Sequence, residues 1–95
     1  MTANLRIDID RLWATLKESA EIGKTPRGGL RRLALSREDG QARWLFKTWC
    51  EEAGLALRVD AMGNMFATRA GRDPNANAIM MASHLDTQIF GGRFD

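Results

Sequence analysis

The spacing of apolar residues changes at Gly54 from a helical period to a strand period. Upstream of this glycine, apolar side chains recur every three or four residues, which is the pattern of amphipathic helices. Downstream of it, Leu55, Leu57 and Val59 alternate with small or charged residues, which is typical of a strand with one buried face. We therefore expect helices followed by strands in an α/β fold.

Two helices are predicted before Gly54. The first covers residues 9–22, with Asp8 as the N-cap and Gly23 as the stop signal. The second begins near Ser36, whose spacing to Asp39 is that of a capping box, and ends before Gly54. The predicted apolar faces consist of Ile9, Leu12, Trp13, Leu16 and Ala20 in the first helix, and of Ala42, Leu45, Phe46, Trp49, Cys50 and Ala53 in the second.

Three strands are predicted after Gly54. Residues 55–59 and 65–69 are expected to pair as antiparallel strands, because Met62, Gly63 and Asn64 between them favour a turn. Residues 78–83 form an apolar run that is polar only at its end, the pattern of a strand covered by helices on both faces. The expected architecture is thus two helices, a strand pair and a buried strand.

Composition excludes several classes of protein. The 95 residues suffice for one domain at most, and 44% hydrophobic with 27% charged residues is typical of globular chains. A net charge of +2 is too small to make nucleic acid or a membrane surface the expected partner. The first helix carries charges from its start, which argues against a secretory signal, and no apolar run approaches the roughly 20 residues of a membrane span. We therefore expect a cytoplasmic protein.

The single cysteine limits redox and metal chemistry. Cys50 has no partner for an internal disulfide, and one thiolate cannot build a cysteine-based metal cluster. Its place beside Trp49 on the apolar side of the second predicted helix favours a small core residue over a reactive thiol.

A basic stretch without acidic residues separates the two predicted helices. Residues 24–35 carry the cations Lys24, Arg27, Arg31 and Arg32 around one proline and two adjacent glycines. An exposed connecting turn is the simpler interpretation, because glycines that follow no strand are weak evidence for a phosphate-binding loop. The alternative is an anion-binding module that uses this stretch, and it predicts strongly salt-dependent binding.

Side chains with metal and proton chemistry follow the predicted buried strand. His84 and Asp86 are two residues apart, so in extended chain they project from the same side, and Asp95 follows after Gly91 and Gly92. A carboxylate that accepts from one ring nitrogen commonly orients a histidine that binds metal through the other. A lone histidine is more often structural, however, and one His with two Asp does not complete a metal site.

These residues resemble a known family. Residues 84–88 (His-Leu-Asp-Thr-Gln) and 91–95 (Gly-Gly-Arg-Phe-Asp) are similar to the signature of the hydantoinase and carbamoylase family of amidases, which are related to dinuclear zinc peptidases. Residues 11–13, 32–36, 52–54 and 60–64 also resemble the opening of that family. The resemblance implies the N-terminal part of a three-layer α/β/α catalytic domain, with residues 1–95 an incomplete portion and the dimerisation or lid domain absent.

The resemblance also implies a site and a reaction. His84 and Asp95 would be metal ligands, Asp95 would bridge two divalent ions (Zn, Mn, Co or Ni), and Asp86 would act in catalysis by orienting His84. The remaining site groups would lie beyond residue 95, so the chain alone would be an inactive fragment. The parent, expected to be a homodimer, would hydrolyse N-carbamoyl-L-amino acids or similar ureido compounds with a metal-activated water. Gln88 would either bind substrate or stabilise its loop.

Four alternatives stay open at this point. An allantoate amidohydrolase and a dinuclear zinc peptidase of the same superfamily would share the predicted donors, His84 and Asp95. A non-catalytic basic module would use residues 24–32. An inert truncated product would fail to fold cooperatively, which a broad thermal transition would reveal.

Overall fold

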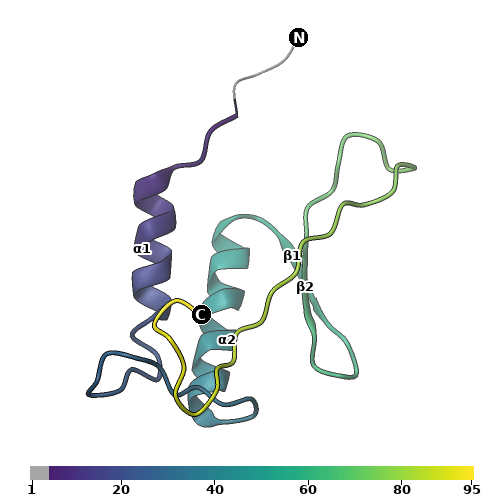
Figure 1. Cartoon of the computed structure of the whole chain (residues 1–95). Coiled ribbons are helices and arrows are strands. Elements are labelled where there is room, and N and C mark those ends of the chain that lie inside the picture. The colour runs from purple at the N-terminus through teal and green to yellow at the C-terminus, as the bar shows by residue number, and fades with distance from the viewer. Residues whose placement is uncertain (1–4) are drawn as a thin grey trace. The chain divides into compact units, whose positions relative to one another are not determined.

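The computed structural model describes residues 5–95 and contains two helices followed by one strand pair (Figure 1). The elements in chain order are α1 (Ile9–Ser19), α2 (Arg37–Glu52), β1 (Ala56–Val59) and β2 (Met65–Thr68). The chain divides into two compact units, one made of Met1–Ala42 with Asp86–Asp95 and the other of Arg43–Leu85. The predicted order of two helices and an antiparallel strand pair is confirmed.

Helix α1 begins where the sequence predicts. The Asp8 carboxylate accepts a hydrogen bond from the Arg11 N–H at 3.0 Å, which satisfies one of the free amides of the first turn. The regular helix ends at Ser19, three residues before the predicted Ile22, and the chain continues as a turn to Gly23. Gly23 has a φ of +84°, a conformation that favours glycine, so it ends this turn rather than the helix itself.

Helix α2 has the predicted reciprocal cap. The Asp39 N–H donates to the Ser36 hydroxyl at 3.1 Å, and the Asp39 carboxylate accepts from the Leu35 N–H at 3.0 Å. Each side chain thereby satisfies a backbone amide that no helical carbonyl can reach. At the other end, Gly54 adopts a φ of +73° after the last turn, as its role as a stop signal requires.

Removing this cap should measurably destabilise α2. Replacing Ser36 by alanine leaves the Asp39 N–H without its acceptor, and we expect a loss of about 1 kcal/mol in the free energy of unfolding. Denaturant unfolding followed by far-UV circular dichroism measures the change. Ser36→Asn keeps an acceptor at the cap and is the matched control, so equal losses in both variants would contradict the capping role.

Strands β1 and β2 pair in the predicted antiparallel direction. Ala56 lies opposite Thr68 and Val59 opposite Met65, with the turn between them closed by the Asp60 side chain. Its carboxylate accepts from the Asn64 side chain at 3.0 Å and from the Asn64 backbone N–H at 2.8 Å. These hydrogen bonds favour the charged form and lower the pKa of Asp60. The predicted hairpin is confirmed.

Cys50 is buried, as the sequence predicts. Only 2% of its surface is exposed, and burial raises the pKa of its thiol, with a further contribution from the neighbouring Glu51 charge. A thiol that is both buried and held in its neutral form is a poor nucleophile. Cys50 therefore serves as a small core residue on α2.

The apolar face of α1 is much more exposed than that of a core helix. None of its residues is buried, and Ile9 and Trp13 are 62% and 47% exposed. Trp13 packs against Phe94 of the C-terminal segment, with ring centroids 5.2 Å apart. The amphipathic pattern predicts the helix correctly, but the described residues cover little of its apolar side.

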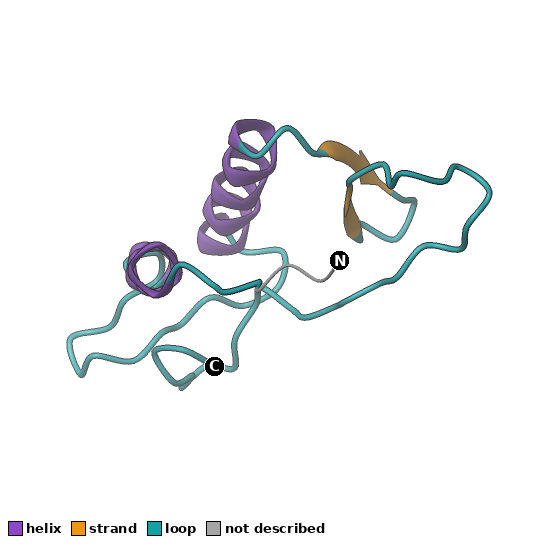
Figure 2. Ribbon diagram, turned by 90° about the horizontal axis from the view of Figure 1, so that it is seen from above, coloured by secondary structure: helices purple, strands orange, loops and turns teal. Residues whose placement is uncertain are grey.

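The predicted buried strand at residues 78–83 is not formed. Figure 2 shows the chain after β2 as a loop that continues to the C-terminus. Ile79 is 93% and Met81 92% exposed, so the run is neither paired nor covered. A strand needs a neighbour for its backbone hydrogen bonds, and the one sheet of the described residues consists of β1 and β2 alone, so the apolar run has no strand beside it.

None of the helices within residues 5–95 combines the length and apolar character that crossing a membrane requires.

Candidate functional site

The three predicted site residues lie in different parts of the chain. His84 is exposed and lies near the end of the unit Arg43–Leu85. Asp86, which is half-buried, and Asp95, which is exposed, belong to the other unit. The shared site of the imidazole with the two carboxylates stays a prediction.

A metal site is not complete within the described residues. Over residues 5–95, no three side chains of His, Cys, Asp or Glu gather in a way that could hold an ion. An imidazole and carboxylates are suitable donors for zinc or manganese, but a catalytic ion needs about three protein ligands. The described residues offer candidate donors and do not by themselves fit a metal ion.

The backbone after Asp86 is fixed by a pair of hydrogen bonds to Arg32. The Thr87 N–H donates to the Arg32 carbonyl at 2.7 Å, and the Arg32 N–H donates to the Thr87 hydroxyl at 2.8 Å. That hydroxyl in turn donates to the Gln88 carbonyl at 2.8 Å. Thr87 is only 6% exposed, so water does not replace these contacts readily. The carboxylate of Asp86 thus stands beside a rigidly held residue.

Residues 87–91 form a loop, which we call the 87–91 loop. Thr87 lies at its start, and a second pair of hydrogen bonds fixes its other end. The Leu30 N–H donates to the Gly91 carbonyl at 3.0 Å, and the Gly91 N–H donates back to Leu30 at 2.9 Å. The backbones approach so closely that a Cβ at Gly29 would lie 2.6 Å from the Gly91 carbonyl oxygen. Residues 29–32 therefore hold both ends of the loop that leads to Asp95.

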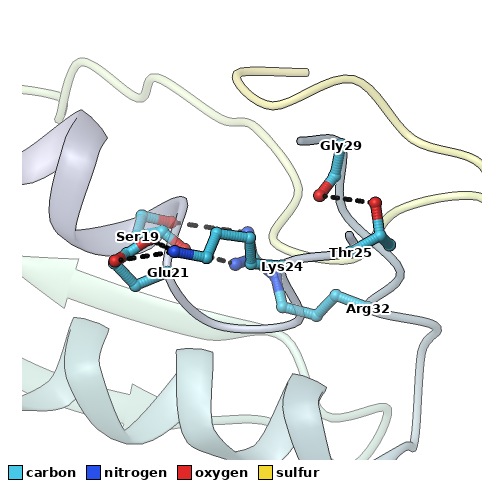
Figure 3. A network of polar contacts seen from close by, with 6 residues as sticks. All are labelled: Ser19, Glu21, Lys24, Thr25, Gly29 and Arg32. Atoms are coloured by element: carbon cyan, nitrogen blue, oxygen red, sulfur yellow. Dashed lines mark hydrogen bonds and ion pairs between the residues drawn. The ribbon is translucent and has the colours of Figure 1, made fainter. Parts of the chain in front are cut away.

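The Arg32 side chain connects this region to the end of α1 (Figure 3). Its guanidinium donates to the carbonyls of Ser19 at 2.8 Å and Ile22 at 3.1 Å. Arg32 is 4% exposed, and burial lowers its pKa while the negative charges of Asp39 and Asp86 oppose that shift. A buried guanidinium needs such partners, since an unpaired buried charge is strongly unfavourable.

The expectation of an exposed connecting turn at residues 24–35 is therefore wrong at two positions. Leu30 is 1% and Arg32 4% exposed, because both contact the C-terminal segment or the end of α1. Lys24 is exposed but forms an ion pair with Glu21 at 3.0 Å. Sequence reasoning missed the role of Arg32, and the only local signal was its position between the apolar residues Leu30 and Leu33.

Comparison with curated proteins finds relatives that match nearly all of this chain. It is 53% identical to an N-carbamoyl-L-amino-acid amidohydrolase of Rhizobium meliloti, over 97% of this chain and 22% of the relative. It is 41% identical to an N-carbamoyl-L-amino acid amidohydrolase of Geobacillus stearothermophilus, over 90% and 21%. Allantoate deiminase 1 of Glycine max is 40% identical over 79% of this chain and 16% of its own length. No family model matches the chain.

Solved structures give the same result for the fold. A hydantoinase/carbamoylase family amidase from Burkholderia ambifaria superposes with a TM-score of 0.92 and 55% identity, over 96% of this chain and 22% of that one. An amidase of the same family from Burkholderia multivorans gives a TM-score of 0.93 and 47% identity, over 98% and 23%. The chain thus spans about a fifth of the length of the proteins it matches.

Proposed function

Because this chain belongs to the hydantoinase/carbamoylase family of amidases, we propose that it is part of the catalytic domain of an enzyme that hydrolyses N-carbamoyl-L-amino acids. The observation that carries the proposal is the 53% identity, across 97% of this chain, to a relative named for that reaction. Hydrolysis forms a bond from water oxygen to the carbamoyl carbon and breaks the C–N bond to the amino acid, whose amine leaves with a proton. The product carbamate then loses carbon dioxide.

The proposal assigns three residues of this chain to the site. His84 and Asp95 are proposed ligands for divalent metal, and Asp86 is the proposed acceptor of a hydrogen bond that would hold the imidazole in one orientation. Two divalent ions bound by a complete donor set would lower the pKa of a bound water to near neutrality and so supply the nucleophile. Since the described donors do not complete such a set, we propose that activity needs groups from outside residues 1–95.

A second candidate substrate class is supported by a specific similarity. The allantoate deiminase of Glycine max is 40% identical over 79% of this chain. Allantoate carries ureido groups, so the same C–N bond cleavage would apply to it. Rates of hydrolysis measured with an N-carbamoyl-L-amino acid, 3-ureidopropionate and allantoate would show which of these substrate classes is preferred.

A chimera tests the proposed function. In it, residues 1–95 of this chain replace the matching 22% of the Rhizobium meliloti relative. We expect the chimera to hydrolyse N-carbamoyl-L-amino acids with a kcat/KM within about tenfold of that relative, a difference of about 1.4 kcal/mol in barrier. The relative without the segment and the isolated 95-residue chain are controls expected to show no turnover. A chimera that unfolds cooperatively yet leaves all N-carbamoyl-L-amino acids intact would refute the proposal.

A further inference from the structure

Residues 29–32 hold the segment that carries two of the three proposed site residues, Asp86 and Asp95, and this contact has a functional consequence. We propose that Arg32 and Thr87 are positioning residues, whose paired hydrogen bonds fix Asp86 at the start of the 87–91 loop while the Arg32 guanidinium fixes the pair to the end of α1. This inference rests on the proposed function, in which Asp86 orients His84.

The pair constrains Asp86 through the backbone. Thr87 directly follows Asp86, and its N–H and hydroxyl contact the carbonyl and N–H of the same residue, Arg32, at 2.7 and 2.8 Å. The N–H belongs to the peptide unit that joins Asp86 to Thr87, and the hydroxyl belongs to the Thr87 side chain, so the two hydrogen bonds of opposite direction together hold Thr87 in place. The start of the Asp86 side chain can therefore move only if buried hydrogen bonds break.

The guanidinium holds Arg32, the other residue of the pair, in a fixed position. One terminal nitrogen donates to the carbonyl of Ser19, the last residue of α1, and to that of Ile22 in the following turn, and the second terminal nitrogen lies 3.4 Å from the Ser19 hydroxyl. The planar fork of arginine places its second nitrogen near the Ser19 hydroxyl while the first donates to both carbonyls, and the single nitrogen of a lysine ammonium cannot make all three contacts in the same geometry. The carboxylate charges of Asp39 and Asp86 both act on this cation, so its charge also balances the acidic side chain that it helps to place.

The Leu30–Gly91 hydrogen bonds prevent the loop from pivoting about this pair. They lie at its far end, so the 87–91 loop is held at two places by one short segment, residues 30–32. Small displacements matter in catalysis, since a shift of about 1 Å in a positioned group can cost roughly 100-fold in rate. We therefore expect loss of the pair to lower kcat more than it changes KM.

The threonine hydroxyl allows a test that changes few atoms. In the 95-residue chain labelled with 15N, Thr87→Val removes the acceptor of the Arg32 N–H while keeping the side-chain volume. We expect amide hydrogen exchange at Arg32 to become about tenfold faster, and Thr87→Ser to restore protection to within about twofold. The Leu12 N–H, which donates to the Asp8 carbonyl, is the internal control and keeps its rate. Unchanged exchange at Arg32 in Thr87→Val would overturn the inference.

The same variants in the chimera measure the effect on catalysis. We expect Thr87→Val to lower kcat about 10- to 100-fold with KM within about twofold, and Thr87→Ser to retain the kcat of the unsubstituted chimera. Arg32→Lys, which keeps the charge and loses the fork, should also lower kcat. An active chimera whose kcat is the same with Thr87→Val overturns this inference alone. A folded chimera that is inactive without any substitution overturns the proposed function and the catalytic part of this inference with it.

Discussion

Replacing His84 or Asp95 by alanine in the chimera is expected to abolish hydrolysis of N-carbamoyl-L-amino acids, with a loss of about 1,000-fold or more in kcat. Each substitution removes a proposed metal ligand, and metal-assisted catalysis supplies several kcal/mol of transition-state stabilisation. His84 is the only histidine of the chain, so no neighbouring imidazole of residues 1–95 can replace it. Steady-state kinetics and metal content after gel filtration are the two measurements.

Asp86→Asn is the matched control for these ligand variants. Its amide has nearly the same shape as the carboxylate, and we expect a loss of about 10- to 100-fold in rate with metal content largely retained. The three variants thus separate residues that bind metal from one that orients a ligand. Full metal content in His84→Ala and Asp95→Ala would contradict the proposed ligand roles, even if the rates fell.

Gly91→Ala is expected to cause the largest loss of stability among single substitutions in the 87–91 loop. A Cβ at this position would lie 2.7 Å from the Thr87 Cβ and 3.1 Å from the Leu30 carbonyl oxygen. Relief of these contacts requires the backbones to separate, which breaks the two Leu30–Gly91 hydrogen bonds. We expect a loss of about 3 kcal/mol in the free energy of unfolding, from overpacking together with lost buried hydrogen bonds.

The adjacent glycine offers a control for this substitution. A Cβ at Gly92 would make one ordinary contact, 3.4 Å from the Asp95 Cβ, and Gly92 has no positive φ. Gly92→Ala should therefore change the unfolding free energy by less than about 0.5 kcal/mol. Thermal unfolding followed by circular dichroism compares the two variants. Equal transition midpoints would show that the close approach at Gly91 does not limit stability.

Local sequence signals predict the elements whose interactions are local. The capping residues Ser36 and Asp39 lie within one turn of α2, and the Asp60 contacts that close the hairpin span four residues. The apolar run at residues 78–83 does not form a strand, because pairing partners decide that outcome and sequence periodicity cannot supply them. Intrinsic pattern thus predicts helices and a hairpin here, and fails where a neighbour is required.

The candidate site, like the fold, could be predicted from the sequence only in part. His84, Asp86 and Asp95 could be named from their residue types, their spacing and a family resemblance. The contact between Arg32 and Thr87 joins residues 55 positions apart and has no local signature in the sequence. A cation in a glycine-rich turn is usually solvated, so the position of Arg32 between Leu30 and Leu33 is too weak a signal to predict its burial.

The uncovered apolar run after β2 affects the tendency of the isolated chain to self-associate in solution. The run Ala78–Ile79–Met80–Met81–Ala82 carries neither charge nor proline, and its residues are exposed and belong to no strand. Such a stretch promotes intermolecular β-pairing. The rate at which the isolated chain aggregates will then depend on protein concentration, and not only on the free energy of folding.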